Sequence, residues 1–279
     1  MKNNIVFGCA SKRAKIIYHL TSQYTNAELL LFANGFKLVI ESSKLITKPT
    51  NTLNNLIVRA IYIFLFNKQI IPFKLDSWLL NDANQTTAFY SLIKSISIEN
   101  EETRNKICDF FSKNYLSSFD KKISCLFNFV LGEKQQKYID KFRYYWSSFN
   151  AYCSSISNKN GDTQQLEYLV SKRFKQKTGI LFRDKRDSLI PKLDLSKSDV
   201  EIKETANSIL KCDNIDYQVN NVDAFLLVDC GYYYRNKYFH GEKTPPLVSF
   251  SNSKELDNLK RICGVLQKYL ILFIAEIFK

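Results

Sequence analysis

Glycine and proline, the residues that most often form turns and end helices, are scarce in this sequence. The chain has 8 glycines and 5 prolines among 279 residues. An architecture of many short strands needs frequent tight turns, and such turns draw heavily on both residues. The scarcity therefore favours long helices, and we predict an all-α protein. With 45% hydrophobic and 14% aromatic residues, the chain has enough apolar side chains to bury a core.

The hydrophobic pattern divides the chain into two predicted domains with a boundary at Gly132. Residues 1–131 show no glycine-rich phosphate loop, no paired carboxylates at meaningful spacing and no metal-ligand cluster, so we predict a helical accessory domain of unknown role. Residues 132–279 contain the candidate site. Apolar side chains recur at helical spacing where this second domain begins: Tyr138, Phe142, Tyr145, Trp146, Phe149, Tyr152 and Ile156.

The first domain is predicted to consist of helices joined by polar segments. Thr25 and Glu28 form a capping-box pattern, which predicts a helix over residues 25–43. The apolar residues 56–66 predict a buried helix. Residues 1–24 are predicted to form a strand or a loop that leads into a short helix around Arg13 and His19. Amphipathic patterns predict further helices over residues 86–98, 101–116 and 121–131.

The second domain is predicted to be a helical bundle in which several helix starts can be recognised. Asp162 opens one helix, and Ser198 with Glu201 forms a second capping box. The apolar residues 222–234 predict a buried helix, and Asn252 opens the last helix of the chain.

The helix that begins near residue 222 ends in a cluster of polar groups. His240 is followed by Gly241, a residue type that commonly ends helices, so we place the histidine in the last helical turn. Arg235 and Asn236 precede it, and Asn236 shares a helix face with His240 because they are four residues apart. Histidine gives and takes protons near neutral pH, and the planar arginine fork suits phosphate. These groups could cleave RNA without a metal, with the histidine acting on the 2′-hydroxyl or the leaving oxygen.

Residues 235–241, Arg-Asn-x-x-x-His-Gly, resemble the Arg-polar-(x)n-His signature of HEPN domains. These are small helical bundles found in RNases of toxin–antitoxin, CRISPR and phage-defence systems. Residues 142–152 also resemble the first long helix of many HEPN proteins, where an aromatic run leads into Phe-Asn-Ala. Arg13 and His19 satisfy the spacing as well, but they lack the polar neighbour and the glycine, so we interpret that match as chance.

The resemblance implies a catalytic set and an assembly. His240 would act as general acid and base, Arg235 would stabilise the phosphate in the transition state, and Asn236 would orient or contact the phosphate. HEPN domains commonly bring two such motifs together across an interface, which implies a homodimer, and the product would end in a 2′,3′-cyclic phosphate. In HEPN toxins silenced by a nucleotidyltransferase, a tyrosine lies two residues after the histidine. Glu242 occupies that position here, which disfavours this kind of silencing.

Five further residues are candidates for RNA binding. Tyr234, Lys237 and Tyr238 lie beside the motif, and tyrosine rings can stack on bases. Arg143 could contact phosphate, with a solvated helix face as the alternative. Asn150 could line the active cleft, with a structural hydrogen bond between helices as the alternative.

The charge balance also points to a polyanionic partner such as RNA. The formal net charge is +13, from 40 lysines and arginines against 27 acidic residues. The alternative is compositional drift, because the residues that an A+T-rich genome tends to encode are abundant here. Basic residues gather within residues 172–186. This cluster could form an RNA-facing edge or simply a solvated face.

Cysteine and histidine usage argues against a metal or cofactor site. The 7 cysteines are scattered without a Cys-x-x-Cys pair, and there are only 2 histidines, so we predict neither a metal nor a cofactor. Such cysteines are typical of reduced thiols in a cytoplasmic protein. Residues 1–11 lack the apolar core of a signal peptide. Residues 56–66 are too short to cross a bilayer, so no membrane partner is expected.

Three functions remain open from the sequence. The first is a metal-independent endoribonuclease of HEPN type in toxin–antitoxin or phage defence, with a possible antitoxin or defence-system partner. The second is a catalytically inactive HEPN-like subunit for RNA binding or protein assembly. The third is a helical interaction protein in which Arg235 pairs with a buried carboxylate and His240 binds carbonyls. Burying such polar groups is costly without a functional reason, which argues against the third.

Overall fold

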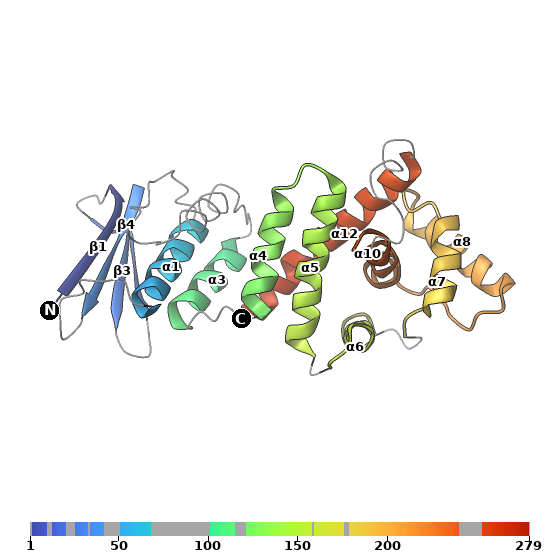
Figure 1. Ribbon diagram of the computed structural model, residues 1–279, viewed down its shortest axis with the longest axis horizontal. Coiled ribbons are helices and arrows are strands. Elements are labelled where there is room, and N and C mark those ends of the chain that lie inside the picture. Colours follow the sequence, from blue (N-terminus) through green and yellow to red (C-terminus); the bar gives the residue numbers. More distant parts are fainter. Residues whose placement is uncertain are drawn as a thin grey trace. The chain divides into compact units, whose positions relative to one another are not determined.

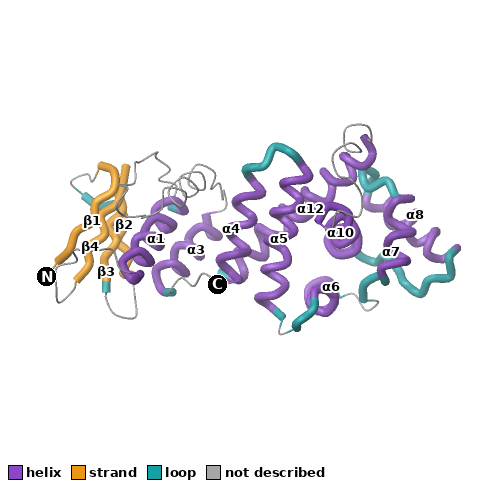
Figure 2. Tube along the Cα trace, viewed as in Figure 1, coloured by secondary structure: helices purple, strands orange, loops and turns teal. Residues whose placement is uncertain are grey.

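A computed structural model describes most of the chain and shows that it is predominantly helical (Figures 1 and 2). It divides into two compact units, one of Met1–Ile123 with Ala275–Lys279 and one of Ser124–Ile274. The domain boundary predicted at Gly132 falls within the helix α4 (Lys121–Glu133). The described residues are 2–9, 13–20, 26–32, 34–41, 51–67, 101–114, 121–157, 159–175, 179–239 and 253–278.

The first unit contains a four-stranded antiparallel sheet in the order β1-β4-β3-β2. Apolar residues alternate along the central strands, so that Leu29, Leu31, Phe36, Leu38 and Ile40 are buried on one face. The helices α1 (Asn51–Phe66) and α3 (Glu101–Lys113) pack against the sheet (Figure 1). The strands are β1 (Lys2–Cys9), β2 (Ile16–Leu20), β3 (Ala27–Phe32) and β4 (Asn34–Glu41).

The sheet corrects two of the helices predicted in the first domain. The helix predicted over residues 25–43 is wrong, because Glu28 lies within β3 and pairs with Val39 of β4. The short helix predicted around residue 19 is also wrong, because His19 lies in β2 with its side chain exposed. The buried helix predicted over residues 56–66 is confirmed as part of α1. The helix predicted over residues 86–98 lies outside the described residues.

A buried arginine joins helices α1 and α3 of the first unit. Arg59 of α1 is fully buried, and its Nε donates to the carbonyl oxygen of Phe111 at 2.6 Å. Its Nη2 donates to the carbonyl oxygen of Ser112 at 2.5 Å. Both carbonyls belong to the last turn of α3, where backbone oxygens lack partners within the helix. Arg59 therefore satisfies the carboxyl end of α3 and is favoured there by the helix dipole.

The second unit is all helical in the part that the structure describes. The aromatic stripe predicted along residues 138–156 forms α5, and its rings Tyr145, Trp146, Phe149 and Tyr152 are buried. Tyr152 stacks on Phe273 of α12 with ring centroids 4.1 Å apart. The helices in this part of the chain include α5 (Tyr138–Ile156), α6 (Asp162–Phe174), α7 (Arg183–Leu189), α8 (Asp199–Cys212), α10 (Gly231–Phe239) and α12 (Ser253–Ile277).

The helix that carries the motif contains a π-helical turn. A short α-helical turn, α9 (Val222–Phe225), runs into η2 (Leu226–Cys230), and α10 follows directly. A π turn inserts one extra residue into the helix, and such insertions are frequent at functional sites. The insertion rotates every later side chain relative to a regular α-helix by about 100°. The motif residues therefore face a direction that a continuous helix would not give them.

Gly231 allows α10 to pack closely against α5. A Cβ atom at this position would lie 2.6 Å from Cζ3 of Trp146. We expect Gly231→Ala to lower the free energy of unfolding by about 1–3 kcal/mol, because the buried indole must move. Urea titration of both proteins measures this difference.

Gly264→Ala is the matched control for this substitution. Gly264 lies within α12, and apart from its chain neighbours and the local helix backbone no heavy atom would lie within 4 Å of its added Cβ. Alanine is the better helix former by about 1 kcal/mol, so we expect this variant to be more stable than the wild type. Equal stabilisation by both substitutions would show that the contact between Gly231 and Trp146 is not tight.

Candidate functional site

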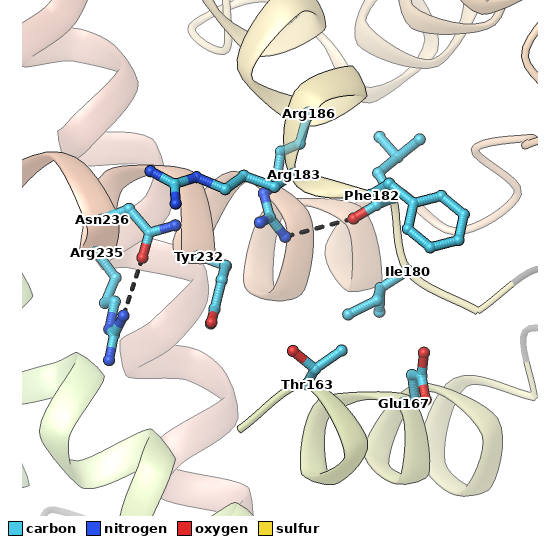
Figure 3. A pocket seen from close by; sticks show the side chains of 10 residues that line it. Thr163, Glu167, Ile180, Phe182, Arg183, Arg186, Tyr232, Arg235 and Asn236 are labelled. Carbon is cyan, nitrogen blue, oxygen red and sulfur yellow. Dashed lines mark hydrogen bonds between the residues drawn. The ribbon is translucent and has the colours of Figure 1, made fainter. Parts of the chain in front are cut away.

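A cavity of about 520 Å³ lies among α6, α7 and α10 (Figure 3). Figure 3 shows Thr163 and Glu167 of α6 on one wall and the arginines of α7 on the wall opposite. The motif helix α10 contributes a third wall. The residues that line the cavity are Thr163, Glu167, Ile180, Leu181, Phe182, Arg183, Arg186, Tyr232, Arg235 and Asn236.

Arg235 is held at the cavity by several contacts. Its Nη1 donates to Oδ1 of Asn236 at 2.9 Å, and its Nη2 lies 3.3 Å from Oδ2 of Asp162 at the start of α6. Its guanidinium also lies 5.4 Å from the ring centre of Tyr232, within the range of a cation–π contact. The side chain keeps 20% of its surface exposed, so it is positioned but accessible from the cavity.

Arg186 is the buried cation of the site. It is 3% exposed, and its guanidinium lies 4.4 Å from the ring centre of Tyr232. Its Nη1 makes a long hydrogen bond of 3.5 Å to the carbonyl oxygen of Leu181, and its Nε has no hydrogen-bond partner within the described part of the chain. Burial lowers the pKa of Arg186, and the nearby Asp229 carboxylate opposes this shift. A buried arginine with an unused donor favours an anionic ligand.

Asp229 of the π turn holds the backbone of Leu181, which lines the cavity. It is buried, and its Oδ1 accepts a hydrogen bond of 2.8 Å from the backbone N–H of Leu181. Its Oδ2 accepts one of 2.7 Å from the Tyr217 hydroxyl. Burial raises the pKa of Asp229 to about 6, while these hydrogen bonds and Arg186 act in the opposite direction. Asp229 therefore anchors the segment that leads into α7.

The raised pKa of Asp229 predicts a pH-dependent stability. Because the folded protein holds this proton to a higher pH than the unfolded chain, the contribution is complete below about pH 4 and is lost as pH rises through about 6. Asp229→Asn mimics the protonated form, so its stability relative to the wild type should increase from about pH 4 to 7 by about 2–3 kcal/mol. Urea unfolding across this range measures the change. A difference in the free energy of unfolding that stays constant over this pH range would contradict the raised pKa of Asp229.

The structure describes two of the three predicted catalytic residues. Arg235 and Asn236 lie together on the cavity wall. His240 follows α10 directly in the sequence, but it lies outside the described residues, as do Gly241 and Glu242. Its relation to Arg235 and Asn236 therefore stays a prediction.

Three of the predicted RNA-binding residues have structural roles. Tyr234 and Tyr238 are 3% and 4% exposed, so their rings offer no free face to a base. The Tyr238 hydroxyl donates to Oε1 of Glu255 at 2.5 Å, and Lys237 forms an ion pair with the same carboxylate. These contacts connect α10 to α12. Nucleobase stacking on Tyr234 and Tyr238 is therefore corrected to core packing.

The two predicted RNA contacts on α5 do not line the cavity. Nη2 of Arg143 donates to the carbonyl oxygen of Tyr238 at 3.1 Å, and Nη1 lies 3.6 Å from Asp140. Arg143 thus satisfies a carbonyl in the last turn of α10, directly before His240 in the sequence. Asn150 is half-buried and is not among the described residues that surround the cavity.

Sequence reasoning did not place at the motif three residues that the fold brings there. Phe182, Arg183 and Arg186 precede Arg235 by many residues, and only folding places them on one cavity. The basic residues at 172–186 gave a partial signal. The structure divides that cluster, because Lys172, Arg173 and other members are exposed whereas Arg186 is buried against Tyr232.

No protein-family model matches this sequence, and comparisons with curated proteins and with solved structures find no match. Within the described residues, no group of three or more histidine, cysteine, aspartate or glutamate side chains is arranged to hold a metal ion. A search of the same residues finds no helix with the length and apolar character needed to cross a membrane. Function is therefore inferred from the cavity and the residues around it.

Proposed function

We propose that this protein is a metal-independent endoribonuclease whose helical C-terminal part is of HEPN type. The observation that carries the proposal is the shared cavity of Arg183, Arg186, Arg235 and Asn236. Several guanidinium groups around one cavity create a site for phosphate, and the net charge of +13 favours a polyanionic substrate. Two of these residues belong to the Arg-polar-xxx-His motif, which connects the cavity to the HEPN resemblance.

The proposed reaction uses the 2′-hydroxyl of RNA as nucleophile. His240 removes the 2′-hydroxyl proton or protonates the leaving 5′-oxygen, and Arg235 stabilises the charge that develops on the phosphate oxygens. The bond from phosphorus to the 2′-oxygen forms while the bond to the 5′-oxygen breaks. The products are a 2′,3′-cyclic phosphate and a 5′-hydroxyl end. Asn236 accepts a hydrogen bond from Arg235 and so orients the guanidinium.

The biological setting follows from the same resemblance. We propose a homodimer that brings two motifs together and acts on cytoplasmic RNA in toxin–antitoxin or phage defence. An antitoxin or another defence protein would then control its activity.

One contact favours the alternative of an inactive RNA-binding or assembly subunit. Asp162 lies 3.3 Å from Arg235, and this carboxylate competes with phosphate for the guanidinium. An inactive subunit would bind RNA equally well with and without His240 and would cleave with neither form.

The ends of the RNA products test the proposed reaction. Labelled transfer, ribosomal and messenger RNA pools are incubated with purified full-length protein in the presence of EDTA. We expect fragments with 2′,3′-cyclic phosphate and 5′-hydroxyl ends. Fragments with 5′-phosphate ends, or cleavage that stops on chelation, would overturn the mechanism.

A further inference from the structure

Phe182 is the most exposed of the large hydrophobic side chains that the structure describes. It is 81% exposed and lies at the edge of the cavity. In Figure 3 its ring lies on the opposite side of the cavity from Arg235. An exposed phenylalanine beside a cluster of cations offers a flat apolar surface next to an anion site.

The backbone on either side of Phe182 is anchored. The preceding residue, Leu181, is buried, and its N–H donates to Asp229. The carbonyl oxygen of Phe182 accepts the first hydrogen bond of α7, from the N–H of Arg186 at 2.9 Å. The backbone that carries the ring is therefore held in place, and this reduces the entropy lost when a ligand packs against the ring.

The charges on the two walls give the cavity a polarity. Arg183 and Arg186 lie on the α7 wall, and the carboxylate of Glu167 lies on the α6 wall with Thr163 (Figure 3). A phosphate is attracted to the arginines and repelled by Glu167. The sugar and base of the same nucleotide carry hydroxyl and amino groups that can donate hydrogen bonds to Glu167. The volume of about 520 Å³ is within the usual range for small-ligand pockets.

We propose that this cavity is a subsite for one nucleotide of single-stranded RNA, with its base stacked on Phe182 and its phosphate bound by Arg183 and Arg186. This inference rests on the proposed function for the identity of the strand. Arg235 then binds the neighbouring phosphate, which is the one that is cleaved. Stacking on a single aromatic ring accepts any base, because every base has an aromatic face.

Binding of a short fluorescein-labelled RNA, measured by anisotropy in EDTA, tests the subsite. All proteins carry His240→Ala, so that the RNA stays intact. We expect Phe182→Ala to raise the Kd by about 5- to 150-fold, because one base loses its stacking partner. Phe182→Trp keeps a stacking surface, so it should retain affinity, and its indole fluorescence should decrease on RNA binding. Val200→Ala, which truncates another exposed apolar side chain, is the matched control and should bind normally.

The salt dependence of binding tests the phosphate contact separately. The logarithm of the association constant falls linearly with the logarithm of the salt concentration. We expect Arg183→Gln to make this negative slope shallower by about 0.7, the value for one lost phosphate contact on a single strand. Lys185→Gln is the control, because Lys185 lies exposed on the same helix and is not among the described residues that line the cavity. Arg186 stays intact in these variants, because its removal would leave Asp229 as a buried carboxylate without its nearby cation.

The outcomes separate this inference from the proposed function. Normal RNA binding by both Phe182→Ala and Arg183→Gln would overturn the subsite, even if cleavage depends on Arg235 and His240. Loss of binding in these variants supports the subsite, even if the wild type cleaves no RNA. Adenosine 5′-monophosphate serves as a competitor. If it binds more tightly than the oligonucleotide, the ligand is a free nucleotide and the assignment to an RNA strand is wrong.

Discussion

Replacing Arg235 by alanine is expected to lower the rate of RNA cleavage by about 100- to 1000-fold, the usual effect of removing one group that stabilises transition-state charge. The guanidinium is positioned by Asn236 and Asp162 and lines the cavity, so its loss removes a preorganised cation. Initial cleavage rates of a labelled RNA in EDTA, at saturating and at low substrate, measure the change. Because the group acts on developing charge, kcat should decrease more than KM increases.

Two further variants make the Arg235 result specific. Arg235→Lys keeps the charge but loses the planar fork, so its rate should lie between those of the wild type and Arg235→Ala. Arg173→Ala removes an exposed arginine of α6 that is not among the described lining residues, and it should cleave nearly as fast as the wild type. Equal rates for Arg235→Ala and the wild type would exclude Arg235 from the reaction.

Arg59→Met is expected to destabilise the first unit strongly. Methionine fills similar space but leaves the carbonyls of Phe111 and Ser112 buried without the donors that Arg59 provides. Each unsatisfied buried group costs about 1–3 kcal/mol, so the free energy of unfolding should fall by at least about 2 kcal/mol. Chemical denaturation followed by circular dichroism measures this loss.

Arg13→Met is the control for the buried arginine. Arg13 belongs to the same unit and is exposed, so its substitution should change stability by less than about 0.5 kcal/mol. If Arg59→Met and Arg13→Met unfold at the same denaturant concentration, Arg59 does not stabilise the end of α3.

The two capping-box patterns show where sequence-based prediction succeeds and where it fails. Ser198 and Glu201 form the predicted box, with hydrogen bonds in both directions at the start of α8. The similar pattern at Thr25 and Glu28 predicted a helix, but Glu28 lies in β3. A cap contributes only about 1 kcal/mol. Pairing with β4 and burial of alternate leucines outweigh that local preference, and neither is visible in a four-residue pattern.

The candidate site could be predicted only in part, for a similar reason. The motif identified Arg235 and Asn236, which line the cavity. The π turn before α10 and the packing against α5 and α12 decide which neighbouring side chains are buried. Tyr234 and Tyr238 therefore belong to the core, although their position beside the motif favoured RNA binding. Arg186 reaches the site through tertiary folding, which no local spacing reveals.

The proposed reaction depends on His240, so it is tested by comparing RNA cleavage by the wild type, His240→Ala and His19→Ala in EDTA. His19 is the other histidine of the chain and lies exposed on β2, outside the unit that contains Arg235. We expect the wild type and His19→Ala to cleave at similar rates and His240→Ala to lose cleavage. Cleavage that persists in His240→Ala, or depends on His19 instead, would contradict the proposed reaction.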